Sequence, residues 1–327
     1  MEYSTHGYAT SKMLQKRINM QTPSEESGYR YSDNLKRLKI LTGWFSILVR
    51  WIRLRPSSVL AIFILTGMVF IATLAPYISP YNPLEIHAQD RLLRPSTMYL
   101  LGTDELGRDM LSMLMHAARI SLLIALGAEA VAVVIGVPLG LLAGYLRGPM
   151  DDLIMRILDS FLAFPGLLIG ITIVGLFGTD KLTLLIAIGI MNMPYLARIV
   201  RAAVLVERGK DYVLATQAIG AHGLYIMVRT ILPNTLSPLI VQISFGLAVA
   251  ILTEASLSFL GLGVQPPQKS WGTLLQIGYS YIRINAWLVT IPGMFIFTTV
   301  WSLNIIGDSL RDAMDPRLRQ VSGHLFG

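Results

Sequence analysis

The 327-residue chain contains no cysteine, and few of its residues carry a charge. The missing cysteines exclude disulfides, thiolate metal sites and cysteine nucleophiles. Charged residues make up 14% of the chain and hydrophobic residues 53%, which is unusual for a soluble domain and typical of a membrane protein with several spans. The composition therefore predicts that most of the chain lies in a lipid bilayer.

Sequence signatures of catalysis are also missing. The chain has no G-x-x-x-x-G-K-[S/T] phosphate-binding loop, no H-E-x-x-H metal motif and no G-x-S-x-G nucleophile motif. The histidines are scattered without the short spacing of metal ligands: His6, His87, His116, His222 and His324. We therefore expect no enzyme activity and no cofactor or metal bound by this chain. The net charge of +7 is not accompanied by the mixed basic and aromatic residues of a nucleic-acid-binding groove, so nucleic acid is not an expected partner.

The first part of the chain has no recognisable targeting signal. Residues 1–39 are polar and are expected to be disordered or only locally ordered. The first long apolar run starts near residue 57, too late for a cleaved signal peptide, and Glu2 excludes N-myristoylation. Ile40–Arg55 is a short apolar stretch interrupted by arginines. It fits either a helix lying in the membrane interface or the cytoplasmic flank of the first span.

Long apolar runs predict an all-α membrane protein, because a helix of about twenty residues crosses a hydrocarbon core of roughly 30 Å and satisfies its own backbone. Six runs have this length: Ser57–Ile78, Ile120–Leu146, Ile157–Phe177, Leu182–Val200, Ile231–Leu252 and Trp287–Ile306. If the N-terminus is cytoplasmic, 20 of the 27 Lys and Arg residues fall in inner segments. This asymmetry predicts cytoplasmic N- and C-termini.

These spans divide the chain into a predicted order of segments. Residues 1–56 form a cytoplasmic tail, 57–78 the first span and 79–116 an external segment. Residues 117–309 form a five-helix membrane domain with a cytoplasmic loop at 201–230, and 310–327 form a second cytoplasmic tail. The order predicts a single membrane domain with one large structured loop on its inner side.

Small residues and prolines recur within the spans. Gly136, Gly140 and Gly144 repeat at intervals of four, a spacing that either lets another helix approach closely or is merely tolerated in lipid. Prolines within the last five runs predict kinked or interrupted helices around a cavity: Pro138, Pro165, Pro194, Pro238 and Pro292.

Three acidic residues fall in or at the ends of spans. Glu129 lies within the second run, Asp159 near the inner end of the third and Glu254 at the outer end of the fifth. Such residues are costly in lipid and face a cavity, a partner or water. Their different predicted depths favour structural hydrogen bonding over a proton or cation relay. Asp308 and Asp312 are expected near the inner surface.

Two polar blocks lie on the predicted outer side. Leu101–Leu122 places Asp104, Glu105, Arg108 and Asp109 around glycines and continues as an amphipathic helix, in either a structural or a binding role. In Glu254–Leu275, Gly261, Gly263, Pro266 and Pro267 make a long continuous helix improbable. This second block predicts either a re-entrant or capping segment or an ordinary connecting loop.

The inner loop, within Arg198–Leu232, has the pattern of two short helices. Asp211 is expected to cap a helix over Tyr212–Ile219, and Gly220 to end it. A second helix is expected over His222–Ile231. The first helix has an apolar side made of Tyr212, Val213, Ala215 and Ile219, which predicts docking of a partner or packing on the chain's own helix ends.

Four blocks of the sequence resemble one family. Tyr212–Asn234, YVLATQAIGAHGLYIMVRTILPN, is similar to the cytoplasmic coupling loop of ATP-binding-cassette (ABC) importer permeases. LGTDELGRD, LSFLGLGVQPP followed by SWG, and NIIGDSLRDAMDPRL resemble the C-type inner-membrane subunit of the dipeptide, oligopeptide and nickel group. The resemblance covers roughly Ser57 to Leu318 and implies a type I importer permease fold with six transmembrane helices, in a bacterial or archaeal plasma (inner) membrane.

The resemblance also implies partners and sites. We expect a second homologous permease subunit, two cytoplasmic ATPase subunits that bind ATP and Mg, and an external substrate-binding protein. The expected ATPase-coupling residues are Asp211, Tyr212, Ala215, Thr216, Gly220 and Ala221. The candidates for contact with the binding protein are Gly102, Asp104, Gly107, Arg108, Asp109, Gly261, Gly263 and Trp271. Leu214 and Thr216 depart from the family pattern, which places Glu and Ala there.

The function expected from the sequence is therefore half of the translocation path of an ATP-driven importer, with di- or oligopeptides as substrate. Nickel chelates, glutathione and sugars are alternative substrates within the resembling group. An ion-coupled secondary transporter is the alternative from another class, and would need paired acids at one depth. A membrane scaffold without a substrate path is a third possible function. Co-purification of ATPase subunits with the chain distinguishes the importer from these two alternatives.

Overall fold

The structure, a computed structural model, describes residues 56–314. The predictions for residues 1–39, for Ile40–Arg55 and for the tail after residue 314 lie outside this part. Within it the chain is helical and has no β-strand. The principal helices are α3 (Pro56–Ile78), α4 (Met110–Leu146), α5 (Pro149–Leu162), α6 (Gly166–Phe177), α7 (Lys181–Arg208), α8 (Asp211–Ala218), α9 (Gly223–Tyr225), α10 (Leu236–Phe259), α11 (Trp271–Ser280) and α12 (Trp287–Met314).

Five continuous helical stretches are long and apolar enough to cross a membrane. They are α3, α4, α7, α12 and the stretch Gly223–Phe259 that includes α10. The second run starts earlier than predicted, because the amphipathic residues from Met110 onward continue directly into α4. The predicted all-α membrane fold is confirmed, with a sixth span present only if the bent pair α5 and α6 counts as one.

The run Ile157–Phe177 is interrupted at Pro165, as the prediction of kinked or interrupted helices expected for one or more of the prolines. The chain bends by 84° between α5 and α6. Pro165 lies at the break with an extended ψ of 124°, and a proline also disfavours helical backbone in the residue before it, here Phe164. The other prolines give no such break: Pro138, Pro194 and Pro292 lie inside continuous helices, and Pro238 lies in the first turn of α10.

Helices α4 and α7 lie against each other, and glycines make the close approach possible. A Cβ atom on Gly140 would lie 2.5 Å from the carbonyl oxygen of Ala197, and one on Gly144 would lie 2.7 Å from Cβ of Val204. Gly136 faces α7 in the same way. The close-approach interpretation of the glycine repeat is therefore confirmed, as expected for small residues at a helix contact.

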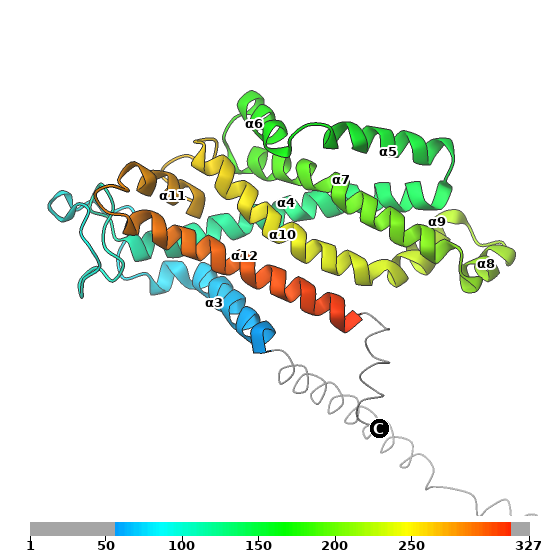
Figure 1. Cartoon of the computed structure of the whole chain (residues 1–327), viewed down its shortest axis with the longest axis horizontal. Coiled ribbons are helices and arrows are strands. Elements are labelled where there is room, and N and C mark those ends of the chain that lie inside the picture. The colour runs from blue at the N-terminus through cyan, green and yellow to red at the C-terminus, as the bar shows by residue number, and fades with distance from the viewer. Residues whose placement is uncertain (1–55, 315–327) are drawn as a thin grey trace, which may run out of the picture. The chain divides into compact units, whose positions relative to one another are not determined.

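The helices carry two separate loop regions at opposite ends (Figure 1). One end holds α8 and α9, and the other holds α11 with the connection between α3 and α4. We refer to them as the α8 end and the α11 end; the charge asymmetry predicts that the α8 end is cytoplasmic. α3 is joined to α12 by a hydrogen bond of 2.6 Å between the hydroxyls of Ser58 and Ser309.

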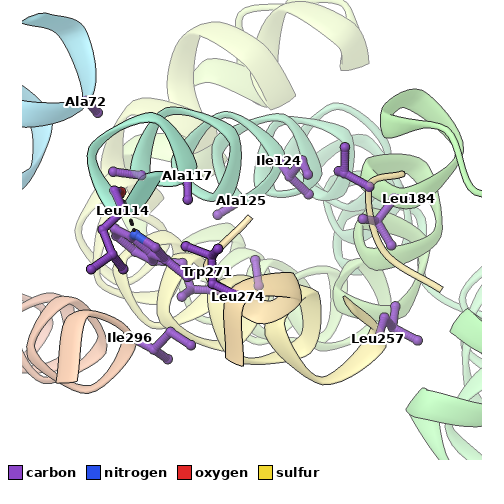
Figure 2. Close-up of a cluster of buried hydrophobic side chains, with 14 of the residues drawn as sticks. Ala72, Leu114, Ala117, Ile124, Ala125, Leu184, Leu257, Trp271, Leu274 and Ile296 are labelled. Atoms are coloured by element: carbon purple, nitrogen blue, oxygen red, sulfur yellow. Dashed lines mark hydrogen bonds between the residues drawn. The ribbon is translucent and has the colours of Figure 1, made fainter. Parts of the chain in front are cut away.

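The buried apolar side chains form two clusters. The first lies toward the α11 end and includes Leu114, Ile124, Leu184 and Trp271 (Figure 2). The second includes α4, α5 and α7 side chains together with Val213 from α8. Each loop region is thus attached to its own part of the core, because Trp271 and Val213 are both 0% exposed.

Candidate functional site

The start of the loop helix α8 differs from the prediction, whereas its end agrees with it. Lys210, with extended backbone, occupies the N-cap position, and Asp211 lies in the first turn without capping it. The prediction of an Asp211 cap is therefore wrong; its carboxylate instead lies near the positive end of the helix dipole. Gly220 has φ of +82° and follows the helix, which confirms its predicted terminating role.

The predicted second loop helix, His222–Ile231, leads directly into the fifth span, as expected. It begins as α9, continues through the π-helical turn Ile226–Ile231, and joins α10 through a 3-10 turn. The His222 ring nitrogen Nδ1 accepts a hydrogen bond of 3.3 Å from the Leu224 amide at its start. The apolar residues of this stretch extend the fifth span to Gly223–Phe259. Only α8 therefore projects as an independent helix.

One apolar and one polar contact fix α8 to the bundle. Val213 lies in the second buried cluster with Val204 and Ile226. The Tyr212 hydroxyl donates a hydrogen bond to Glu207, and the Lys210 ammonium lies 2.5 Å from the same carboxylate. The predicted alternative of packing on the chain's own helices therefore holds for Val213.

The hydrogen bond from Tyr212 persists over the whole physiological pH range. Partial desolvation of this side chain, which is 38% exposed, together with the bond to Glu207, raises the pKa of Tyr212 from its ordinary value of 10.0 to about 12. Because the folded-state pKa is the higher one, the stabilisation is complete below pH 10 and is lost as the pH rises toward 12. Titration of Tyr212 is therefore not a switch at neutral pH.

The other side of α8 and the chain after it expose apolar side chains. Leu214 is 50% and Ile219 84% exposed, and Leu224 and Tyr225 are exposed beyond them. The predicted coupling residues all lie in this region: Asp211, Tyr212, Ala215 and Gly220 are exposed, and Thr216 and Ala221 are half-buried. An exposed apolar patch on a helix with a fixed opposite side is typical of a docking surface.

Two ion pairs near this end were not found by sequence reasoning. Arg201 on α7 holds Asp151 on α5 through two hydrogen bonds of 2.6 Å. Arg198 on α7 pairs with Asp159, the predicted bundle residue, whose side chain is exposed. These pairs had no sequence signal, because the two arginines are three residues apart on α7 and the two acids eight apart on α5. Only the fold, with its bend at Pro165, places the two helices side by side.

The α11 end holds a buried ionic network built from the two predicted outer blocks. The Arg108 guanidinium donates to Asp104 over 2.7 Å from Nε, and the Lys269 ammonium lies 3.7 Å from the same carboxylate. Asp109 accepts hydrogen bonds of 2.8 and 2.6 Å from the Ser112 amide and hydroxyl, which caps α4. Burial, followed by repulsion from Arg108, lowers the pKa of Lys269.

The short helix α11 covers the end of the first cluster. Its Trp271 ring nitrogen donates to the Leu114 carbonyl over 3.2 Å, drawn as a dashed line in Figure 2. Ser270 and Thr273 form a reciprocal capping box at its start. At ten residues α11 is too short to span a membrane, which agrees with the capping-segment interpretation rather than an ordinary loop.

Most candidates for contact with a binding protein are buried in this chain. Gly261 is exposed, whereas the remaining members of the set are buried: Gly102, Asp104, Gly107, Arg108, Asp109, Gly263 and Trp271. Within this set, Asp104 and Trp271 join the two outer blocks, through Lys269 and through the Leu114 carbonyl. The exposed residues beside them, such as Leu106 and Gln265, supply the accessible surface of this end.

Removing Arg108 is expected to destabilise the α11 end. Arg108→Ala leaves the Asp104 carboxylate, 2% exposed, without its main partner, and breaking a buried pair in this way costs about 3–5 kcal/mol. The thermal unfolding temperature of the purified chain should fall by several degrees. Arg283→Ala, at an exposed position of the same end, is the control and should leave it unchanged. Equal unfolding temperatures for both variants would contradict a structural role for the network.

The two acids inside the bundle have different surroundings. Glu254 is 0% exposed and accepts hydrogen bonds from Ser121 over 3.1 Å and Ser258 over 2.6 Å. Glu129 is buried beside Gly246, and its Oε2 atom has no hydrogen-bond partner within the described chain. Glu254 therefore fits the predicted structural role. Within residues 56–314, no three His, Asp or Glu side chains lie close enough together to hold a metal ion.

The described residues thus form a bundle of membrane-spanning helices with an anchored loop helix at one end. Residues 136–320 match the family described as the inner-membrane component of binding-protein-dependent transport systems. The chain belongs to this family of ABC importer permeases, which are multi-pass proteins of the bacterial inner membrane.

Relatives with curated names agree with this assignment. The chain is 44% identical to the di/tripeptide transport system permease DppC of Pseudomonas aeruginosa, over 78% of this chain and 86% of that protein. It is 41% identical to the dipeptide permease DppC of Haemophilus influenzae, over 78% and 91%. It is 38% identical to the glutathione permease GsiD of Pectobacterium atrosepticum, over 86% and 93%.

A solved structure supports the fold. An inward-facing crystal form of the MetNI methionine ABC transporter matches with a TM-score of 0.53 at 20% identity, covering 63% of this chain and 98% of that chain. At this identity the match shows the fold alone. The predicted importer permease fold is therefore confirmed, and the cytoplasmic position of both termini stays a prediction.

Proposed function

We propose that this permease carries di- or tripeptides and passes the motion of ATPase subunits through α8. The dipeptide and di/tripeptide names of its relatives support the substrate class, and the glutathione permease GsiD, itself a carrier of a small peptide, is consistent with it. The observation that carries the coupling role is the two-sided character of α8, with Val213 fully buried and Ile219 84% exposed.

The partner at α8 is inferred from the missing catalytic motif. The chain has no phosphate-binding loop, so the energy for transport comes from another subunit. The α8 end is the predicted cytoplasmic end, where ATP is available. Two ATPase subunits, a second permease subunit and an external binding protein complete the proposed importer, with ATP and Mg bound only in the ATPases.

The contacts of α8 suggest how force is transmitted. Val213 and the Glu207 carboxylate attach α8 to the end of α7, and Gly220 joins it to the continuous stretch that becomes α10. A displacement of α8 therefore acts on two spanning helices at once. The ion pairs from Arg201 and Arg198 carry it from α7 to α5. A rigid helix that biases two states of the bundle is the element that such coupling requires.

The docking proposal is tested by paired serine substitutions. Leu214→Ser with Ile219→Ser should reduce the ATPase subunits that co-purify with this chain at least tenfold, because two apolar contacts of this size contribute a few kcal/mol and about 1.4 kcal/mol is already a factor of ten. The matched control is Leu60→Ser with Tyr77→Ser on α3, whose exposures of 51% and 84% equal those of the pair on α8 at 50% and 84%. The control should retain the ATPases.

A separate measurement tests the substrate. Vesicles containing the whole importer and its binding protein should accumulate labelled dipeptide only with ATP present. Uptake of a labelled nickel chelate or sugar, but not of dipeptide or tripeptide, would overturn the substrate class while leaving the docking result intact. Full co-purification of the ATPase subunits with the Leu214→Ser, Ile219→Ser variant would instead overturn the proposed docking surface.

A further inference from the structure

A cavity of about 490 Å³ at the α11 end is lined by cationic and apolar side chains. Its basic or imidazole lining residues are His116, Arg119, Lys181 and Lys269. They come from α4, from the first residue of α7 and from the loop before α11. No acidic residue lines the cavity. The rest of the lining is apolar apart from Gln268: Pro83, Leu84, Met113, Ala117, Ile120, Leu123 and Pro267.

The positive charge of this cavity is not neutralised by the chain. The side chains of Arg119 and Lys181 form no ion pair or hydrogen bond within residues 56–314. Asp180, next to Lys181, is occupied with capping α7. Lys269 shares Asp104 with Arg108, which lies closer to that carboxylate. Two unpaired cations therefore converge on one space, which favours an anion there.

The cavity lies at the border of the membrane-spanning part. Arg119 directly precedes the apolar run of α4, and Lys181 directly precedes that of α7. The two helices run alongside each other just below, where a Cβ atom on Gly127 would lie 3.2 Å from the Leu185 side chain. Lys181 therefore lies about one helical turn deeper than Arg119, roughly 6 Å along the helix axes, a difference that two long basic side chains can bridge to reach one lipid phosphate.

Exposed apolar side chains continue from the cavity along both helices. Leu123 and Leu126 on α4 are 51% and 59% exposed, and Leu182 on α7 is 63% exposed. Leu123 also lines the cavity. A ligand with one anionic group and a long apolar part would thus contact cations at one end and leucines at the other.

We propose that this cavity binds an anionic membrane phospholipid, with its phosphate between Arg119 and Lys181 and an acyl chain along Leu123 and Leu126. The lining argues against a peptide, because a peptide carries an ammonium group as well as a carboxylate and the cavity offers no acid to pair with it. A lipid of net negative charge fits the lining better than a zwitterionic one for the same reason. The proposal does not depend on what the importer carries.

Lipid retention by the purified importer tests the proposal. The intact complex in detergent is titrated with palmitoyl-oleoyl-phosphatidylglycerol or with the phosphatidylcholine of the same chains, and bound lipid is counted by native mass spectrometry. The wild type should prefer phosphatidylglycerol. Arg119→Gln with Lys181→Gln should weaken its binding roughly tenfold or more, since each cation near a lipid headgroup contributes about 1 kcal/mol.

Two further variants separate the site from general surface charge. Arg94→Gln with Arg283→Gln removes the same charge from exposed positions at the same end and should keep the preference. Arg119→Lys with Lys181→Arg keeps both charges and should also keep the preference for phosphatidylglycerol. An unchanged preference in the double glutamine variant would overturn the site. Displacement of the lipid by equimolar glycerol phosphate would overturn the assignment of the ligand as a lipid, because the acyl chain would then contribute nothing to binding.

A cross-link identifies the occupant in the assembled importer. Because the chain has no cysteine, Gln268→Cys places its only thiol at the cavity wall, where a benzophenone maleimide can be attached. Illumination of the complex in phosphatidylglycerol nanodiscs should give adducts of lipid mass, reduced when Arg119→Gln and Lys181→Gln are added. Adducts to the binding protein or to the second permease, in place of lipid, would show that the cavity belongs to a protein interface and overturn the proposal.

Discussion

Replacing Gly140 by alanine is expected to destabilise the chain, although alanine normally favours a helix over glycine by about 1 kcal/mol. The added Cβ would lie 2.5 Å from the Ala197 carbonyl oxygen and 2.7 Å from Cβ of Val200, distances at which α4 and α7 must move apart. Overpacking of this kind costs about 1–3 kcal/mol, and Gly140→Leu should prevent folding. The measurement is the thermal unfolding temperature of the detergent-purified chain, together with its yield in the membrane.

Gly67 on α3 provides the matched control. A Cβ atom at Gly67 would have no neighbour within 4 Å, so Gly67→Ala should be neutral or slightly stabilising. The two substitutions are chemically identical and both lie inside membrane-spanning helices. Their effects should have opposite sign. If Gly140→Ala raised the unfolding temperature as much as Gly67→Ala, the close contact between α4 and α7 would not limit stability.

The sequence was most informative where the physical signal is local. Apolar length predicted the spans, the four-residue glycine spacing favoured the approach of another helix to the second span without indicating which one, and the isolated Gly220 predicted the end of α8. The bend between α5 and α6 was predicted only in general, because every predicted span contains a proline, Pro76 in α3 included, and of these only Pro165 lies at a break. Which proline interrupts a helix depends on the neighbours that replace the lost hydrogen bond, and these are not visible in the sequence.

The two candidate sites were predictable to different degrees. For α8 the sequence predicted the helix and its apolar residues, but it grouped Tyr212, Val213, Ala215 and Ile219 on one side. In the structure Val213 is buried and the other three are exposed, so which residue attaches the helix was visible only in the fold. For the outer blocks, Asp104 and Lys269 are far apart in the sequence, and only the fold brings them together. Turn-rich polar segments suggested an exposed contact surface, whereas the charges pair with one another and are buried. The lipid cavity had no sequence signal, because its four cationic or imidazole residues come from three distant segments.

Replacing Gly220 by valine is expected to uncouple ATP hydrolysis from uptake. Gly220 has φ of +82° and no neighbour within 4 Å of a Cβ atom, so the substitution meets no steric obstacle beyond its own backbone. A left-handed conformation costs an ordinary residue about 1–2 kcal/mol, and a β-branched residue more. Valine should therefore move α8 into other orientations without unfolding the bundle. In vesicles, peptide taken up per ATP hydrolysed should fall about tenfold or more.

Gly220→Asn distinguishes this backbone effect from a change of surface. Asparagine adds a side chain of similar size to valine but tolerates the left-handed region, so its coupling ratio should stay near that of the wild type. Both variants should still co-purify with ATPase subunits, because Leu214 and Ile219 are unchanged. An equal loss of coupling in both variants would mean that the added side chain disturbs docking. No loss of coupling in either variant would mean that α8 need not be held rigidly. A loss of coupling in the valine variant alone supports the proposed role of α8, because a helix transmits force to α10 only while its junction keeps one conformation.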